Sequence, residues 1–260
     1  MMDPSLRLSV SKVKCYDSCH KKFKYTYILK TPRKEWDFYV FGKLLHKALE
    51  EFHFAYLNGS KEPFNKTMPE AFKIAKFEQQ DKLKPEMAKE CFQILLQYLK
   101  IVSLNKNHLL SRPIKAVEQN FELPLNDQIT LVGAIDRTQI DPDQVLHVAD
   151  YKTSKNKKFL ENDPFQLMTY AMVLMMQDPT LQMVRASYIL LRHNFEPITW
   201  TFNRDEIMKI KDKYLDYANK IINEVEYEAN PSKMCRFCDF IDQCEQGQRI
   251  IGNFNGEVNW

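Results

Sequence analysis

Residues 133–152 read GAIDRTQIDPDQVLHVADYK, two runs of apolar and β-branched residues on either side of Asp141-Pro142-Asp143. Such runs, separated by turn residues, predict two neighbouring antiparallel strands. Asp136 falls in the first and Asp150 in the second, so both carboxylates could bind one hard cation such as Mg²⁺. Lys152 should point to the same face as Asp150, because strand side chains alternate. An ammonium there could orient or help deprotonate a water and offset charge on a phosphoryl transition state.

Hydrophobic periodicity divides the rest of the chain into helical and strand segments. From residue 9 to about 105 the pattern predicts helices, and one apolar stripe runs along 41–52. A turn is expected at 124–127, where Pro124 begins a run of turn-forming residues. The fold class that follows is α/β, with helices flanking a mixed central sheet. We expect strands at 114–123, 129–140, 145–151, 185–192 and 197–202, and later helices at 164–177 and 204–228.

Composition narrows the chemistry available to the cysteines. The chain has 260 residues, of which 44% are apolar, so it can bury a core. We find no run of roughly 18 apolar residues that could span a membrane, and the start of the sequence lacks the apolar region of a secretory signal. A cytoplasmic protein without membrane contact is therefore expected. Thiols stay reduced there, so clustered cysteines indicate a metal or a redox role.

Four cysteines lie towards the two ends of the chain. Cys19 stands near the start, and Cys235, Cys238 and Cys244 form a C-x₂-C-x₅-C pattern near the end. Four thiolates can hold a tetrahedral zinc ion or an iron-sulfur cluster, and the residues alone leave both open. Cys91 falls in an apolar helical run and is expected to be a small buried residue.

Positive charge is unevenly distributed. Residues 5–34 carry nine Lys or Arg against Asp17, which gives +8 and leaves −5 for the remainder of a chain whose net charge is +3. A second acid-free group of lysines follows Lys152. Basic patches suit a polyphosphate partner, although a solvated basic surface is the alternative. The lysines that we expect to contact such a partner are Lys12, Lys21, Lys22 and Lys155.

Four short motifs occur in one order along the chain: G-x-x-x-H at 42–46, G-x-x-D at 133–136, D-x-K at 150–152 and Q-x-x-x-Y at 166–170. This order resembles RecB-type nucleases of the PD-(D/E)XK superfamily. The opening segment is also similar to that family's S-x-L-x-x-Y-x-x-C-P-x-x-F, with His20 in place of the proline. This departure puts the local turn in doubt and makes Cys15 an alternative ligand. The residues that occupy the named positions of this pattern are Ser11, Val13, Tyr16, Cys19, His20 and Phe23.

The resemblance implies a restriction-endonuclease-like core with a helical N-terminal elaboration and a C-terminal cysteine cluster. It implies a single domain over 1–245, with a helical part at 9–110, the core at 111–228, a cysteine segment at 229–245 and a tail at 246–260. With the cysteine spacing it resembles the iron-sulfur branch that includes the AddB nuclease domain and the fourth CRISPR-associated protein family. Stand-alone viral nucleases share the pattern, so a bacterial, archaeal or phage-infected cell is expected.

The same resemblance assigns roles to individual residues. Mg²⁺ or Mn²⁺ would be bound by His46, Asp136, Asp150 and the Tyr151 carbonyl, and Asp136, Asp150 and Lys152 would be catalytic. Gln166 and Tyr170 would touch DNA or support the active site. A [4Fe-4S] cluster, with zinc as the alternative, would be held by Cys19, Cys235, Cys238 and Cys244.

The expected activity is metal-dependent exonucleolytic hydrolysis of single-stranded DNA ends in recombination, repair or CRISPR-type processing. Expected partners are DNA and helicase, recombinase or integrase-type proteins, since the sequence has no phosphate-binding loop for ATP. One alternative is a catalytically quiet DNA-end-binding subunit of a larger complex, although binding alone would not require the lysine and both carboxylates. A second is a structural protein whose cysteines hold zinc.

Overall fold

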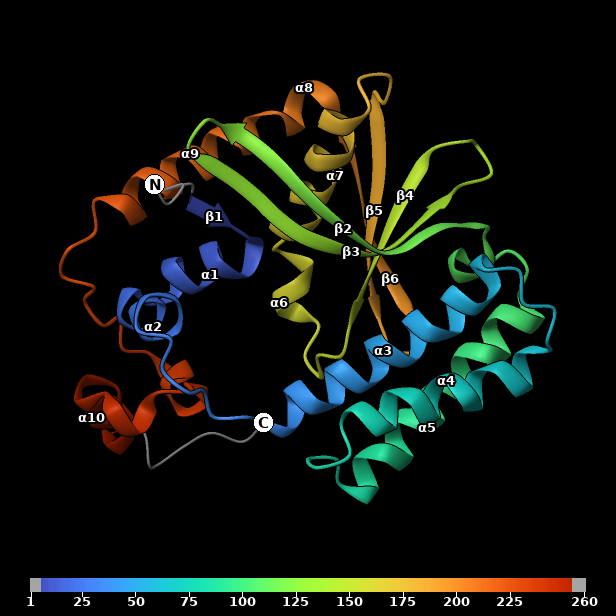
Figure 1. Cartoon of the computed structure of the whole chain (residues 1–260), viewed down its shortest axis with the longest axis horizontal. Helices are drawn as coiled ribbons and strands as arrows, with labels where there is room; N and C mark the ends of the chain where they lie inside the picture. Colours follow the sequence, from blue (N-terminus) through green and yellow to red (C-terminus); the bar gives the residue numbers. More distant parts are fainter. Residues whose placement is uncertain (1–5, 254–260) are drawn as a thin grey trace. The chain divides into compact units, whose positions relative to one another are not determined.

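The computed structural model of the chain describes residues 6–253 (Figure 1). Helices fill most of residues 10–111, three consecutive strands follow, and helices flank the remaining strands, so the fold is mixed α/β, as predicted. None of the helices within it is long and apolar enough to cross a membrane. The strands are β1 (Leu6–Leu8), β2 (Ile114–Asn126), β3 (Ile129–Ile140), β4 (Leu146–Lys152), β5 (Met183–Leu190) and β6 (Glu196–Asn203). The helices are α1 (Val10–Ser18), α2 (His20–Phe23), η1 (Lys24–Ile28), α3 (Asp37–Leu57), α4 (Phe64–Glu78), α5 (Pro85–Leu104), η2 (Leu109–Ser111), α6 (Lys158–Glu161), α7 (Phe165–Gln177), α8 (Arg204–Ile207), α9 (Lys209–Ile222), η3 (Lys233–Phe237), η4 (Ile241–Gln243) and α10 (Glu245–Asn253).

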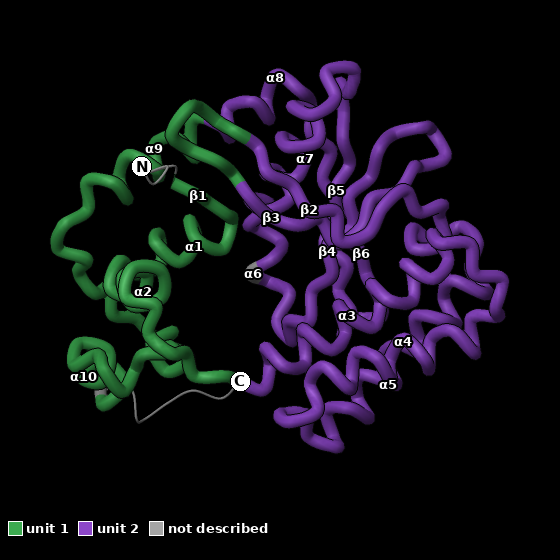
Figure 2. Tube along the Cα trace, in the orientation of Figure 1, with its two compact units in different colours: residues 1–35, 124–131, 212–260 green, residues 36–123, 132–211 purple. Residues whose placement is uncertain are grey.

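Two compact units share the chain, and each draws on separate stretches of sequence (Figure 2). Unit 1 comprises Met1–Glu35, Pro124–Leu131 and Asp212–Trp260. Unit 2 comprises Trp36–Leu123 and Val132–Lys211. The opening and closing parts of the chain thus belong to the same unit. The single domain over 1–245 remains a prediction.

The mixed sheet expected from the sequence forms the centre of unit 2. β3 and β4 are antiparallel, β4 and β5 parallel, and β5 and β6 antiparallel. β2 also pairs with β3, which completes the predicted meander of three strands. The turn expected at 124–127 is wrong in part, since β2 continues through Pro124 and the chain turns at 127–128. A proline fits an extended strand wherever its missing N–H is not needed for pairing.

Helices cover the sheet of unit 2 through apolar faces. α3, α4 and α5 lie side by side and share one apolar core, which includes Leu44, Leu95 and the sheet residue Ile189 (Figure 1). α7 contacts β4 and β5, and its residues from Thr169 to Met175 are all buried. Burial on nearly every side explains why α7 reads as an apolar run rather than as an amphipathic helix.

Unit 1 joins the beginning of the chain to its end. β1 pairs in parallel with the start of β3, with Leu6 opposite Ile129, a three-residue strand too short to predict from its sequence. The last long helix was expected to run to residue 228, but α9 ends at Ile222. Glu224 instead accepts hydrogen bonds from the Tyr16 hydroxyl at 3.0 Å and the Tyr227 N–H at 3.1 Å, which turn the chain away from the helical path.

His20 stands where the resembling family has proline, and its contacts define the local turn. It begins α2, its ring stacks on Tyr16 with centroids 4.1 Å apart, and its Nδ1 lies 2.6 Å from Glu224 Oε2. Cys19 precedes it in extended conformation and caps α2. Aromatic stacking and an ion pair therefore hold the turn after Cys19 without a proline.

Candidate active site

Helix α3 approaches the end of β4 closely, and this approach brings His46 to the sheet. A Cβ added to Gly42 would lie 3.4 Å from Thr153 Oγ1, at van der Waals distance, so the helix passes close to the residue that follows β4. One turn later, His46 Nε2 lies 2.9 Å from the Tyr151 carbonyl oxygen. His46 Nδ1 lies 3.4 Å from Asp136 Oδ2. The predicted metal ligands of helix and sheet thus converge.

Asp136 is anchored to the neighbouring strand. Its Oδ2 accepts a hydrogen bond from the Tyr151 N–H at 2.8 Å, which fixes the carboxylate against β4. The glycine of the same motif has a separate role, since a Cβ at Gly133 would come within 2.6 Å of the Phe121 ring on β2. Phe121 in turn packs edge-on against Tyr170, with centroids 6.2 Å apart. Gly133 therefore lets an aromatic ring cover the strand beside Asp136.

Glu118 is a site residue that the sequence reasoning missed. It lies in β2, and its carboxylate, His46 and Asp136 each offer one ligand atom within 4.8 Å of the other two. Burial first, and then the charge of Asp136, raises the pKa of Glu118 to about 7. Its φ of 43° is unusual for a residue with a side chain. A lone Glu in a strand gives no sequence signal, because only the pairing of β2 with β3 places it beside Asp136.

Asp150 and Lys152 form a buried ion pair at the end of β4. Asp150 is 1% exposed, and the Lys152 Nζ lies 2.5 Å from its Oδ2. This contact has the distance of an ion pair, yet within the described residues Oδ2 makes no well-aligned hydrogen bond. Burial raises the pKa of Asp150, Lys152 opposes that rise, and Asp136 adds to it.

These residues fit a divalent cation. The buried Asp150 carboxylate is repelled by the charge of Asp136, and a bound cation would offset that repulsion. His46, Glu118 and Asp136 supply one nitrogen and two carboxylates, the kinds of ligand that hold Mg²⁺ or Mn²⁺ in proteins. A cation would also favour the ionised form of Glu118, whose pKa is raised in the ion's absence.

Lys152 is held by a short relay from α7. Its Nζ donates to Gln166 Oε1 at 2.8 Å, and Gln166 Nε2 donates to the Tyr170 hydroxyl at 2.7 Å. The ammonium also lies 5.0 Å from the centroid of the Tyr188 ring. Tyr170 is buried, at 5% exposure. Of the two roles expected for Gln166 and Tyr170, these contacts describe support of the site, and contact with DNA remains a prediction.

The lysines expected to bind DNA lie in different parts of the structure. Lys155 is exposed in unit 2 and lines a cleft with Glu90 and His193. Lys12, Lys21 and Lys22 belong to unit 1. Lys12 Nζ donates to the Arg7 carbonyl at 2.8 Å and Lys21 Nζ to Gln246 Oε1 at 3.0 Å, while Lys22 lines the pocket of the four cysteines.

The four predicted cysteine ligands line one pocket of unit 1, and Cys15 does not line it. Backbone N–H groups point at two of the sulfurs. Cys19 Sγ accepts from the N–H of Asn230 at 3.4 Å and from that of Lys22 at 3.5 Å, and Cys235 Sγ accepts from the Ser232 N–H at 3.3 Å. Such N–H groups stabilise thiolates in metal sites.

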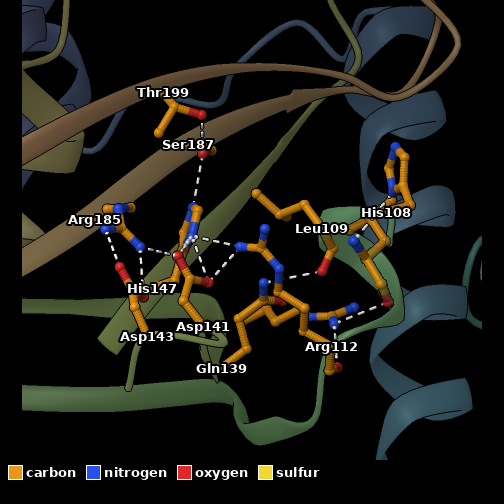
Figure 3. A network of polar contacts seen from close by, with 12 residues as sticks. His108, Leu109, Arg112, Gln139, Asp141, Asp143, His147, Arg185, Ser187 and Thr199 are labelled. Atoms are coloured by element: carbon orange, nitrogen blue, oxygen red, sulfur yellow. Dashed lines mark hydrogen bonds and ion pairs between the residues drawn. The ribbon is translucent and has the colours of Figure 1, made fainter. Parts of the chain in front are cut away.

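A second polar cluster in unit 2 has the residue types of a hydrolase triad (Figure 3). His147 lies between Asp141 and Ser187, with Nδ1 3.0 Å from the carboxylate and Nε2 2.8 Å from the hydroxyl oxygen. All three are buried, at 2% exposure or less, so no substrate reaches the serine. Arg112 and Arg185 also contact Asp141. The cluster is therefore structural and ties the turn after β3 to β5.

Comparisons with known proteins identify the family of the chain. A model of the PD-(D/E)XK nuclease superfamily matches residues 7–245. The chain therefore belongs to the PD-(D/E)XK nuclease superfamily. The sequence matches none of the curated proteins compared with it.

Solved structures that are similar to the chain include the following two. A candidate exonuclease from Eubacterium rectale has a TM-score of 0.52 and 8% identity, over 98% of this chain and 89% of that one. At that identity, the likeness shows the fold alone. The protein SSO0001 has 15% identity over 87% of this chain and 94% of its own, but its TM-score is only 0.36.

Proposed function

We propose that this protein is a divalent-metal-dependent deoxyribonuclease that removes nucleotides from the ends of single-stranded DNA. One observation carries the proposal: the ligand atoms of His46, Glu118 and Asp136 gather within 4.8 Å of one another at the strand that carries the Asp150–Lys152 ion pair. A DNA-binding subunit without catalysis would not require a lysine ammonium beside these carboxylates.

The chain's own residues prepare the hydrolysis. Asp150 and Gln166 hold the Lys152 ammonium, whose remaining N–H can donate to the attacking water or to a phosphate oxygen. The Tyr151 N–H keeps the Asp136 carboxylate turned towards His46. Water adds to phosphorus, the bond from phosphorus to the 3′ oxygen breaks, and the leaving oxygen takes up a proton.

Mg²⁺ or Mn²⁺ would be held by His46, Glu118, Asp136 and Asp150 with the Tyr151 carbonyl. When bound, the ion supplies Lewis-acid polarisation of the scissile phosphate. The histidine makes Mn²⁺ more acceptable here than in a site built of oxygen ligands alone.

End-labelled DNA tests the activity directly. We expect the protein to shorten linear single strands with Mg²⁺ or Mn²⁺, to leave a closed single-stranded circle intact, and to lose activity as Asp150→Asn or Lys152→Ala. Asp143→Asn is the matched control, because Asp143 is an exposed carboxylate that pairs with Arg185 away from the site. Cutting of the circle would refute exonucleolytic action, and undiminished cleavage by Asp150→Asn would refute the site.

We infer further that Cys19, Cys235, Cys238 and Cys244 hold a [4Fe-4S] cluster. All four cysteines line one pocket of unit 1, and backbone N–H groups donate to the sulfurs of Cys19 and Cys235. Hydrogen bonds of this kind accompany the sulfurs of iron-sulfur clusters.

Metal analysis of anaerobically purified protein tests the cluster. We expect brown protein that contains iron and acid-labile sulfide in equal amounts, and loss of both in Cys238→Ser. Cys15→Ser is the control and should keep both, because Cys15 does not line the pocket. Colourless protein that contains zinc would overturn the assignment.

A further inference from the structure

Three large aromatic rings stand together at the start of α3. The rings of Trp36 and Phe38 are stacked, with centroids 5.9 Å apart at 16°, and Phe38 and Tyr39 are 4.5 Å apart at 57°. Phe38 is 46% exposed and Tyr39 40% exposed. Large apolar side chains gathered in contact at a surface indicate a binding site for a partner. We call Trp36, Phe38 and Tyr39 the aromatic group.

The aromatic group belongs to the helix that carries His46. Tyr39 lies seven residues before His46, which is close to two helical turns. The two side chains therefore project from the same face, about 10 Å apart along the helix axis. Gly42 lies between them and presents no side chain. A linear ligand that lay along this face would run from the aromatic rings to His46.

Positive charge accompanies the rings. Lys43 supplies it, exposed on α3 between Tyr39 and His46, whereas the charge of Lys84 at the start of α5 is balanced by Asp37, whose Oδ2 lies 2.5 Å from the Lys84 Nζ. Proteins that bind single strands combine such cations, which contact phosphates, with aromatic rings on which bases stack. A purely apolar partner surface would gain nothing from Lys43.

We propose that the aromatic group stacks on the bases of single-stranded nucleic acid and holds the strand along α3 on its way to His46. The choice of single-stranded nucleic acid as the ligand rests on the proposed nuclease function. The new element is the place on α3 where the strand is held. Phe38 and Tyr39 are predicted to act on binding, because both rings are exposed at the start of α3, whereas Lys152 is held by Asp150 and Gln166.

Binding to a fluorescent oligo-dT strand, measured by anisotropy without divalent metal, tests the inference apart from catalysis. Stacking is worth about 1–3 kcal/mol per base, so Phe38→Ala and Tyr39→Ala should each bind roughly 5- to 100-fold more weakly. Tyr39→Phe keeps the ring and should retain the parent's affinity. Phe77→Ala is the matched control, since Phe77 is 70% exposed on α4 and should bind like the parent.

A strand of the same length without bases separates stacking from charge. The parent should bind it more weakly than oligo-dT, whereas the double variant Phe38→Ala/Tyr39→Ala should show a much smaller difference between the two strands. Parent-like affinity of both alanine variants for oligo-dT would overturn the inference. The inference would also be overturned if the parent sedimented as a dimer, the alanine variants sedimented as monomers, and both bound oligo-dT equally well. That result would assign the rings to contact with a second copy of the chain.

The same measurements distinguish the inference from the proposed function. Asp150→Asn should bind oligo-dT like the parent but not cleave it. If the parent binds through Phe38 and Tyr39 and still leaves DNA intact with every metal, the proposed catalysis fails and this inference stands. If the parent cleaves while the alanine variants bind normally, only this inference fails.

Discussion

Replacing Gln166 by leucine should slow cleavage without weakening the binding of DNA. The side chain uses both polar atoms within the protein, since Oε1 accepts from Lys152 at 2.8 Å and Nε2 donates to the Tyr170 hydroxyl at 2.7 Å. Leucine has a similar size but removes both bonds. The Lys152 ammonium would then keep only Asp150 as an anchor and would lose its fixed position.

The size of the effect follows from the kind of hydrogen bond that is lost. A bond to a charged group is worth about 1.5–3 kcal/mol, which corresponds to a fall of roughly 10- to 100-fold in the single-turnover rate of Gln166→Leu. Tyr170→Phe removes only a neutral bond of about 0.5–1.5 kcal/mol and should slow cleavage roughly 2- to 10-fold. Because both act through Lys152, the double variant should be no slower than Gln166→Leu alone.

Single-turnover cleavage of end-labelled oligonucleotide gives the rate, and anisotropy without metal gives the affinity. Gln177→Leu is the control, because it makes the same substitution at the exposed end of the same helix, α7. Weakened binding by Gln166→Leu at an unchanged single-turnover rate would refute the positioning role and assign Gln166 to DNA contact.

Three further outcomes test the supports around the site. Gly133→Ala would bring a methyl group within 2.6 Å of Phe121 and should lower the free energy of unfolding in urea by about 1–3 kcal/mol, whereas Gly252→Ala, with open space around it, should not. Arg137→Met should lower the free energy of unfolding by about 3–5 kcal/mol, because the buried guanidinium donates to a tyrosine hydroxyl and to two backbone carbonyls. A loss below about 1 kcal/mol would show that those groups find other partners. Burial holds the pKa of His53 well below 6.5, so the unfolded chain binds more protons than the folded chain below about pH 6.5. The free energy of unfolding should therefore fall as the pH drops below about 6.5, and His53→Gln should lose this part of the pH dependence. A variant with the same pH profile as the parent would contradict the prediction.

Much of the fold can be predicted from local patterns in the sequence. The two strands around Asp141-Pro142-Asp143 appear as predicted, because alternating apolar residues on either side of a proline turn leave little choice of pairing. The helix expected after the strand of Asp150 and Lys152 also forms where predicted. The end of α9 was wrong by six residues, since Glu224 leaves the helix for contacts with residues about 200 positions earlier in the chain, which no local pattern reveals.

By itself, the sequence determined the mixed α/β class and the chemical identity of most site residues. Residue type and spacing are local properties: D-x-K puts a carboxylate and an ammonium on one strand face whatever surrounds it. The tertiary structure alone decided which groups meet. In the folded chain Glu118 of β2 lies beside His46 and Asp136, and Lys152 donates a hydrogen bond to Gln166 on α7. Those contacts depend on strand register and helix packing over long separations in the chain, and only the folded backbone defines such distances.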